Sequence, residues 1–201
     1  MERDKKVLNG LEFYKVDVCV EGRNKENIFQ QYSKKCLSET LKKPKYAKFK
    51  SLFGNEDEAL MDLPLGESLF QLKKRGDDRY KCFLNINGDK KFCRFTIKED
   101  SLTTKKGLYC YYENGNLAYI GRSRKPFLSR VNDGYGKIQP KNCYIDGQST
   151  NCHLNALINE SENIEFYVHP INDDLEIKET ERRLINTYKE DLLWNVQKNH
   201  Y

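Results

Sequence analysis

The stretch of residues 107–121 constrains the fold of this chain more than any other part of the sequence. Its centre is Asn114-Gly115, with tyrosine-rich runs that favour strands on both sides. An Asn-Gly pair in that setting is the strongest short-range signal for a β-hairpin, because both residues tolerate positive φ. Such a hairpin brings Tyr109 close to Tyr119, and the glycines at both ends of the stretch let another backbone or a phosphate approach closely. Taken alone, the pattern is also typical of an ordinary hairpin that covers a core.

The two ends of this stretch resemble the paired motifs of the GIY-YIG nucleases. Gly107-Leu108-Tyr109 corresponds to the first triplet, with leucine in place of isoleucine, and Tyr119-Ile120-Gly121 matches the second. Four more residues of the family's pattern follow in the same order, the glutamate in a Glu-x-x-Leu-Ile sequence: Arg122, Arg130, Glu181 and Asn195. The resemblance covers about half of the chain, roughly residues 105–197.

The resemblance implies a nuclease that depends on Mg²⁺ or Mn²⁺ and hydrolyses phosphodiester bonds. Glu181 would bind the metal ion, which keeps several waters and completes its shell with substrate phosphate. Tyr109 or Tyr119 would accept the proton of the attacking water, while Arg122 and Arg130 would stabilise the phosphate. A free tyrosine titrates near pKa ~10, so we expect the positive charge of Arg122 to lower this pKa and let the tyrosine act as a base near neutral pH.

Asn195 would anchor this site, because its amide both donates and accepts hydrogen bonds. The interval from Glu181 to Asn195 is longer than in many relatives, and Leu-Leu-Trp precedes the asparagine where a proline is often found. Some restriction enzymes of the family carry a histidine where this chain has Gly134, and His153 is a substitute candidate. Each residue also has a structural explanation: charges on solvated helix faces and tyrosines in a core.

The order of the expected elements indicates an α+β fold, in which a small antiparallel three-stranded sheet is flanked by helices. Residues 105–201 would form this nuclease core, and residues 1–104 an N-terminal α/β elaboration that contacts DNA. Besides the hairpin, the core is expected to contain a strand at residues 164–168 and helices after Pro126, at 151–159 and at 177–189. The elaboration is expected to contain a strand at 13–20, a helix at 27–41 and a second hairpin at 80–97.

Positive charge is concentrated outside the half that carries the motifs. Residues 1–100 contain 22 Lys and Arg against 17 Asp and Glu, whereas residues 101–201 contain 13 of each. The segment 42–50 interleaves five lysines with Tyr46 and Phe49, which suits phosphate contacts and stacking on an exposed base. A solvated lysine-rich loop whose aromatics turn into the core explains the segment as well. The candidate DNA-binding residues are Lys42, Lys43, Lys45, Lys48, Lys50, Arg124 and Lys125.

The remaining composition bears on location and metal chemistry. No apolar run approaches the roughly 20 residues that a membrane helix needs, and the N-terminus lacks the apolar core of a signal peptide. We therefore expect a cytoplasmic protein without membrane contact. Seven cysteines occur without a Cys-x-x-Cys pair, which favours reduced structural thiols over disulfides. A metal site built from Cys143, Cys152 and His153 is the alternative.

Together these features predict a Mg²⁺-dependent DNA endonuclease, most closely an enzyme of the type II restriction class. One such site cuts one strand, so double-strand cleavage needs a homodimer or two sequential events. Two alternatives stay open. The chain could be a non-catalytic nucleic-acid-binding module with the same fold, or a nuclease of DNA repair or of a mobile element that acts on branched or nicked DNA.

Overall fold

Two compact units make up the chain, and each is formed by segments that are far apart in the sequence. The computed structural model describes residues 3–192 and 194–195. The first unit comprises Met1–Glu21, Arg94–Lys137 and Glu160–Tyr201, and the second comprises Gly22–Cys93 and Ile138–Asn159. Residues 105–201 therefore contribute to both units. The expected boundary at residue 104 divides a DNA-contacting region from a nuclease core, and this division by function stays a prediction.

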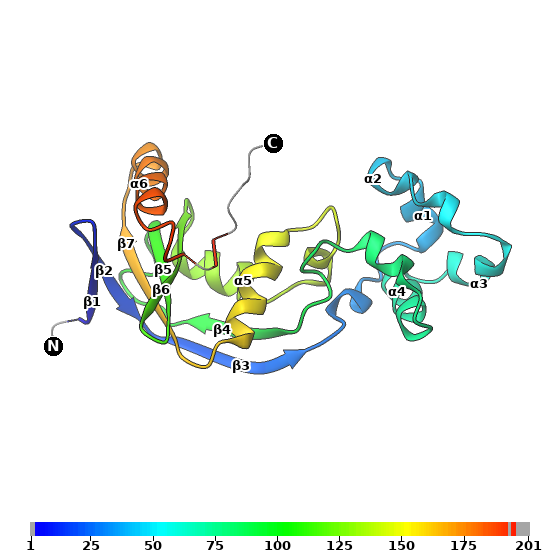
Figure 1. Ribbon diagram of the computed structural model, residues 1–201, viewed down its shortest axis with the longest axis horizontal. Coiled ribbons are helices and arrows are strands. Elements are labelled where there is room, and N and C mark those ends of the chain that lie inside the picture. Colours follow the sequence, from blue (N-terminus) through cyan, green and yellow to red (C-terminus); the bar gives the residue numbers. More distant parts are fainter. Residues whose placement is uncertain (1–2, 193, 196–201) are drawn as a thin grey trace. The chain divides into compact units, whose positions relative to one another are not determined.

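An antiparallel sheet of five strands, in the order β1-β2-β7-β5-β6, forms the body of the first unit (Figure 1). The sheet is curled. The hairpin of β5 and β6 turns at Asn114 and Gly115, whose φ angles are 50° and 82°, so the predicted hairpin is confirmed. The strands are β1 (Lys5–Leu8), β2 (Leu11–Val16), β5 (Gly107–Glu113), β6 (Asn116–Ser123) and β7 (Ile164–Pro170).

The prediction of a small three-stranded sheet was wrong, because β1 and β2 extend the sheet beyond β7. Tyr14 of β2 lies opposite Val168 of β7. Lys15 and Glu165 form an ion pair across this junction although 150 positions separate them. Pairing over such a distance in sequence depends on which strands meet in the folded chain, and no local pattern signals it.

Different elements cover the two faces of this sheet. Helix α6 (Asp174–Thr187) packs through Ile177 and Leu184 into a core that also contains Leu108 and Ile120 of the sheet. Successive side chains of a strand point to opposite faces, so Tyr109 and Tyr119, which adjoin Leu108 and Ile120 in sequence, belong to the other side. The sheet therefore separates α6 from the aromatic face described next.

The opposite face of the sheet carries a cluster of aromatic rings. The ring centroids of Tyr111 and Phe166 are 4.9 Å apart, and those of Tyr109 and Tyr135 are 6.2 Å apart. Tyr135 ends a π-helical segment, η5 (Ser129–Tyr135). Single π-helical turns occur frequently at functional sites, and this one lies directly against the motif tyrosines.

The second unit consists of short helices around a core of its own, which includes Phe29, Leu69, Phe83 and Tyr144. The helices of this unit are η1 (Ile28–Gln31), α1 (Leu37–Leu41), α2 (Pro44–Ala47), η2 (Lys50–Leu52), η3 (Asn55–Asp57), α3 (Glu58–Met61), α4 (Leu65–Lys74), η4 (Asp78–Phe83), η6 (Pro140–Cys143) and α5 (Ser149–Glu160).

In the part of the chain that the structure describes, no helix is long and apolar enough to cross a membrane.

The predicted second hairpin at residues 80–97 was wrong. Its first half is the 3₁₀-helix η4, and its second half, β4 (Phe92–Ile97), pairs with β3 (Val18–Lys25) in a separate two-stranded sheet. The side chain of Asn85 accepts a hydrogen bond from the backbone of Asn87 (3.0 Å) and donates to the carbonyl of Asn142 (2.7 Å). The second of these bonds ties the turn to η6, so the Asn-Gly signal here does not join two strands.

Two other local predictions in the N-terminal half were wrong in part. The strand expected at residues 13–20 is divided at Asp17 between β2 and β3. The helix expected at residues 27–41 is reduced to η1 and α1, because the backbone between them forms a bridge from Cys36 to Pro64. In both places a distant strand or loop competes for the backbone hydrogen bonds that the local pattern would use.

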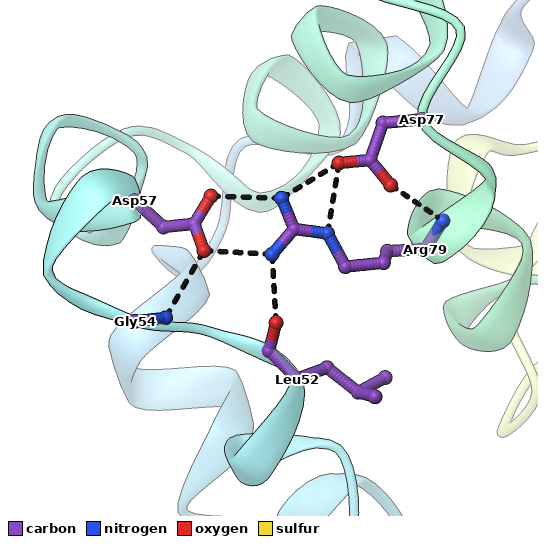
Figure 2. A network of polar contacts seen from close by, with 5 residues as sticks. All are labelled: Leu52, Gly54, Asp57, Asp77 and Arg79. Atoms are coloured by element: carbon purple, nitrogen blue, oxygen red, sulfur yellow. Dashed lines mark hydrogen bonds and ion pairs between the residues drawn. The ribbon is translucent and has the colours of Figure 1, made fainter.

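An arginine network fastens the loop that leads into α3 (Figure 2). Arg79 donates to both carboxylate oxygens of Asp57 (2.7 and 2.9 Å), to the carboxylate of Asp77 (2.8 Å) and to the carbonyl of Leu52 (2.7 Å). The Asp57 side chain is 2% exposed and also accepts from the backbone N–H of Gly54 (3.1 Å). Hydrogen bonds from Arg79 hold the pKa of both carboxyl groups below their usual value.

Candidate active site

Tyr109 and Tyr119 lie together, as the hairpin predicted. Their ring centroids are 6.0 Å apart, and Gly121 lies directly opposite Tyr109 in the β5–β6 register. A Cβ atom at Gly121 would lie 2.6 Å from Cε1 of Tyr119 and 2.8 Å from the hydroxyl oxygen of Tyr109. Only glycine leaves room for both rings, so the final glycine of the second triplet positions the tyrosine pair through its missing side chain.

The hydroxyl group of Tyr109 is buried without a partner. Tyr109 is 1% exposed, and its hydroxyl makes no hydrogen bond within the part of the chain that the structure describes. Arg130 and Tyr119 lie close enough to this hydroxyl for it to act on the pKa of both, but neither makes a hydrogen bond of normal geometry with it. The guanidinium carbon of Arg130 is 5.0 Å from the ring centroid of Tyr135. A buried hydroxyl without a partner costs free energy, and such groups are often found where a protein binds or reacts.

Burial raises the pKa of Tyr119 well above its usual value, and the neighbouring phenol of Tyr109 raises it further. The positive charge of Arg130 lowers this pKa but does not outweigh burial. Tyr119 therefore keeps its proton at neutral pH. The cation that acts most strongly on Tyr119 is Arg130 and not Arg122, the residue expected to lower the pKa of a tyrosine.

Arg122 is engaged on the other face of the sheet. It lies opposite Leu108 in the register of β5 and β6, and its Nη1 atom is 2.8 Å from Oε2 of Glu181 on α6. The Glu181 side chain is 18% exposed. A single accessible carboxylate fits Mg²⁺, which takes one or two protein carboxylates and keeps several waters. A metal ion at Glu181 would compete with Arg122 for this carboxylate.

Asn195 binds the backbone of β6, the strand at one edge of the sheet. Its side-chain oxygen accepts a hydrogen bond from the N–H of Ile120 (3.0 Å), and its amide nitrogen donates to the carbonyl of Ile120 (2.9 Å). One residue earlier, the N–H of Trp194 donates to the carbonyl of Ala118 (3.0 Å). Asn195 therefore holds the strand between the tyrosine and the glycine of the second triplet.

The predicted residues form two groups on opposite faces of β6. Tyr109, Tyr119 and Arg130 lie on the aromatic face, whereas Arg122 and Glu181 lie on the face covered by α6. The charge of Glu181 nevertheless acts on Tyr119. β6 is an edge strand, and Trp194 and Asn195 occupy the backbone groups of Ala118 and Ile120 on its free side.

Sequence reasoning missed two members of the aromatic group. The hydroxyl of Tyr111 donates a hydrogen bond to the hydroxyl of Tyr135 (3.1 Å), and the ring of Tyr135 lies beneath Arg130. The alternation of side chains along β5 places Tyr111 on the face of Tyr109, so that signal was present. Tyr135 had no comparable signal, because a π-helical segment changes the helical spacing.

The alternative metal ligands find no support. Among the described residues, no group of three or more His, Cys, Asp and Glu could hold a metal ion, and all seven cysteines are free thiols. Gly134 lies within η5 of the first unit, while His153 lies on α5 in the second. The hypothesis that His153 substitutes for a histidine at position 134 stays a prediction.

The lysine segment keeps its charges at the surface and its aromatic rings inside. Tyr46 is 1% exposed, and its hydroxyl donates to Asp146. The ring centroid of Phe49 is 5.3 Å from that of Phe83. Stacking of Tyr46 on a base is therefore contradicted, and the interpretation with aromatics in the core is confirmed. Among the candidate DNA-binding residues, Lys43 is half-buried, and the exposed ones are Lys42, Lys45, Lys48, Lys50, Arg124 and Lys125.

No protein-family model matches this chain, and no curated protein or solved structure matches it. The likeness to GIY-YIG nucleases therefore rests on the two triplets and on the residues that follow them in order.

Proposed function

We propose that this protein is a Mg²⁺-dependent DNA endonuclease. The proposal is supported by one observation above all: Tyr119 lies beside Tyr109 and Arg130 on one face of β6, and the charge of Glu181, which pairs with Arg122 on the other face, still acts on it. A buried phenol, two guanidinium groups and an accessible carboxylate at one sheet edge are the groups that phosphodiester hydrolysis uses.

Each side chain has an assigned part in this proposal. Glu181 would hold the Mg²⁺ ion, which supplies positive charge and makes a bound water more acidic. Arg130 and Arg122 offer guanidinium groups to phosphate oxygens, and Arg122 would then exchange its carboxylate partner for phosphate. Tyr119 keeps its proton and is partly exposed. We therefore assign it to orienting the water or a phosphate oxygen, and the hydroxyl of Tyr109 to holding Tyr119 in place once substrate has bound.

The more specific part of the proposal is a cytoplasmic restriction enzyme of type II. Such an enzyme recognises and cuts both strands of a duplex. With one candidate site in each chain, cleavage of both strands requires a homodimer or two successive cuts.

The test is incubation of the purified full chain with supercoiled plasmid and long linear DNA in Mg²⁺, beside Glu181→Ala. Discrete fragments that the variant no longer produces are expected. Glu179→Ala is the matched control, because Glu179 is an exposed glutamate on the same helix and its removal should leave cleavage unchanged. Full activity in Glu181→Ala would refute the proposal, and nicking without discrete fragments would favour a repair or mobile-element nuclease.

A non-catalytic nucleic-acid-binding module is the second candidate, and the ion pair between Arg122 and Glu181 favours it. This pair neutralises the carboxylate that would hold the metal ion. This second candidate function predicts that DNA binding is sensitive to salt and that no cleavage occurs in Mg²⁺ or Mn²⁺. A gel shift on DNA that stays intact in the same incubation would support it.

A further inference from the structure

The net positive charge of this chain comes from a single short stretch of the second unit. That unit contains 17 Lys and Arg against 11 Asp and Glu, an excess of 6, whereas the first unit contains 18 against 19. Residues 34–50 hold seven lysines and one glutamate, also an excess of 6. The stretch thus accounts for the entire excess. We call the seven side chains the lysine surface: Lys34, Lys35, Lys42, Lys43, Lys45, Lys48 and Lys50.

Among the described residues, the lysine surface is a run of cations without acidic partners, whereas the other lysines of its unit that lack such partners, Lys25, Lys74 and Lys90, are scattered along the sequence. Within the described part of the chain, no carboxylate lies within ion-pair distance of any of its seven lysines, although Lys73 pairs with Asp89 and Lys91 with Glu26. The single acid in the stretch, Glu39, accepts a hydrogen bond from the backbone N–H of Cys36 (3.2 Å) at the start of α1. No ion pair among the described residues therefore compensates this surface, and Asp146 and Glu39 act on Lys43 only at longer range.

A further cation from a distant segment reinforces the centre of the surface. Lys141 lies close enough to Lys43 for the two charges to repel, as does Lys35. Burial and then these two cations lower the pKa of Lys43. The nearby carboxylate of Asp146 is already shared between Lys141 and the hydroxyl of Tyr46. Lys35, Lys43 and Lys141 thus gather where one anionic oxygen group would relieve their mutual repulsion.

The inward orientation of the aromatic rings decides what kind of nucleic-acid contact the surface can make. Proteins that bind single strands stack exposed aromatic rings on the bases. Here Tyr46 is fully buried and Phe49 packs on the core. Ammonium groups without a stacking platform suit the phosphates of an intact duplex, whose bases are already stacked on one another.

We propose that the lysine surface, together with Lys141, binds the phosphate backbone of double-stranded DNA irrespective of its sequence. For the kind of partner, this inference rests on the proposed nuclease function, but it involves none of the residues assigned to cleavage. In this proposal the second unit holds the protein on the duplex.

The test is fluorescence anisotropy of the full chain with a labelled duplex of random sequence, in EDTA, between about 50 and 200 mM salt. The variant Lys35→Gln/Lys43→Gln/Lys45→Gln removes three charges from the surface. Each phosphate contact contributes about 0.9 to the slope of log affinity against log salt concentration, so the magnitude of this slope should fall by about 2.7 in the variant. Affinity at the lowest salt should fall about tenfold or more. The charge-matched control Lys25→Gln/Lys74→Gln/Lys90→Gln alters exposed lysines of the same unit and should bind as the unchanged protein does.

Equal losses in the two triple variants would refute the proposal, because general attraction would then explain the binding. Tighter binding of single-stranded DNA would also refute it, as would binding of polyglutamate with the same loss in the surface variant. Circular dichroism establishes that both variants are folded. If the duplex binds but is never cut in Mg²⁺, only the nuclease proposal fails. If it is cut by the surface variant with unchanged affinity, only this inference fails.

Discussion

The buried hydroxyl of Tyr109 lowers the stability of the fold, and we expect it to serve the function. In the same aromatic cluster the hydroxyls of Tyr111 and Tyr135 bond to each other, whereas that of Tyr109 has no partner among the described residues. Phenylalanine would fill the same space without the cost of burying a polar group. Retention of the hydroxyl is therefore best explained by a task that appears when substrate binds.

Tyr109→Phe is expected to raise the free energy of unfolding by about 1 kcal/mol, because it removes a desolvated group that lacks a hydrogen bond. DNA cleavage should fall in the same variant. Tyr111→Phe is the control and should lower the free energy of unfolding, since it breaks a bond between two buried hydroxyls. Urea unfolding and plasmid cleavage measure the two properties. Lower stability in Tyr109→Phe would contradict the assignment.

At the scale of single elements, the edge strand β6 depends on a residue from beyond the last helix. Asn195 satisfies both backbone groups of Ile120, and these groups would otherwise be unpaired at the edge of the sheet. Exposed strand edges invite pairing with other chains. The asparagine thus completes the strand that carries Tyr119, Gly121 and Arg122.

Asn195→Ala is expected to accelerate hydrogen exchange at the Ile120 amide and to lower the free energy of unfolding by about 1–3 kcal/mol. Exchange followed by mass spectrometry or NMR measures the first effect. Asn186→Ala removes an exposed asparagine on α6 and should change neither quantity. Unaltered protection of Ile120 in Asn195→Ala would show that the strand does not need this residue.

Elements set by neighbouring residues were predicted from the sequence, and elements set by distant partners were not. The β5–β6 hairpin, strand β7 and helix α6 each carry their own signal: a turn pair, alternation or helical periodicity. The pairing of β2 with β7 carries none, because it depends on tertiary contacts. Residues 80–83 alternate like a strand, yet Tyr80 and Phe83 are both buried in a 3₁₀-helix, where positions i and i+3 share a face.

The candidate site divides in the same way. Its residue types and their order along the chain could be predicted, and so could the proximity of Tyr109 and Tyr119. The pairing of Arg122 with Glu181 and the separation of Arg130 from Arg122 by β6 could not. These depend on which face of the sheet each helix covers, and that choice follows from packing of the whole unit.

At the scale of the whole molecule, acid should act on the second unit through the carboxylates that Arg79 holds. In the second unit, Arg79 holds the pKa of Asp57 and Asp77 below the usual value. A carboxyl group with a depressed pKa in the folded state stabilises the fold above its unfolded pKa, near ~3.9. That contribution is lost as the pH falls through the folded pKa.

Asp57→Asn should therefore lower the free energy of unfolding by about 2 kcal/mol at neutral pH, with the deficit shrinking as the pH falls below about 4. Urea unfolding followed by far-ultraviolet circular dichroism measures it. Fluorescence of the single tryptophan, Trp194, reports on the first unit and allows the transitions to be compared. Asp62→Asn, an exposed aspartate of the same unit, should be neutral. A deficit that does not change with pH would contradict the role of the Asp57 carboxylate.

The sheet order of the first unit conflicts with the order in which a ribosome makes its strands. β7 lies between β2 and β5, yet it is the last of the five strands to be synthesised. Until it emerges, β2 and β5 each present an unpaired inner edge, and both edges can recruit other chains. Translation that pauses before β7 would expose nascent molecules to aggregation. A pause just after β7 would find a sheet whose interior strands are all paired.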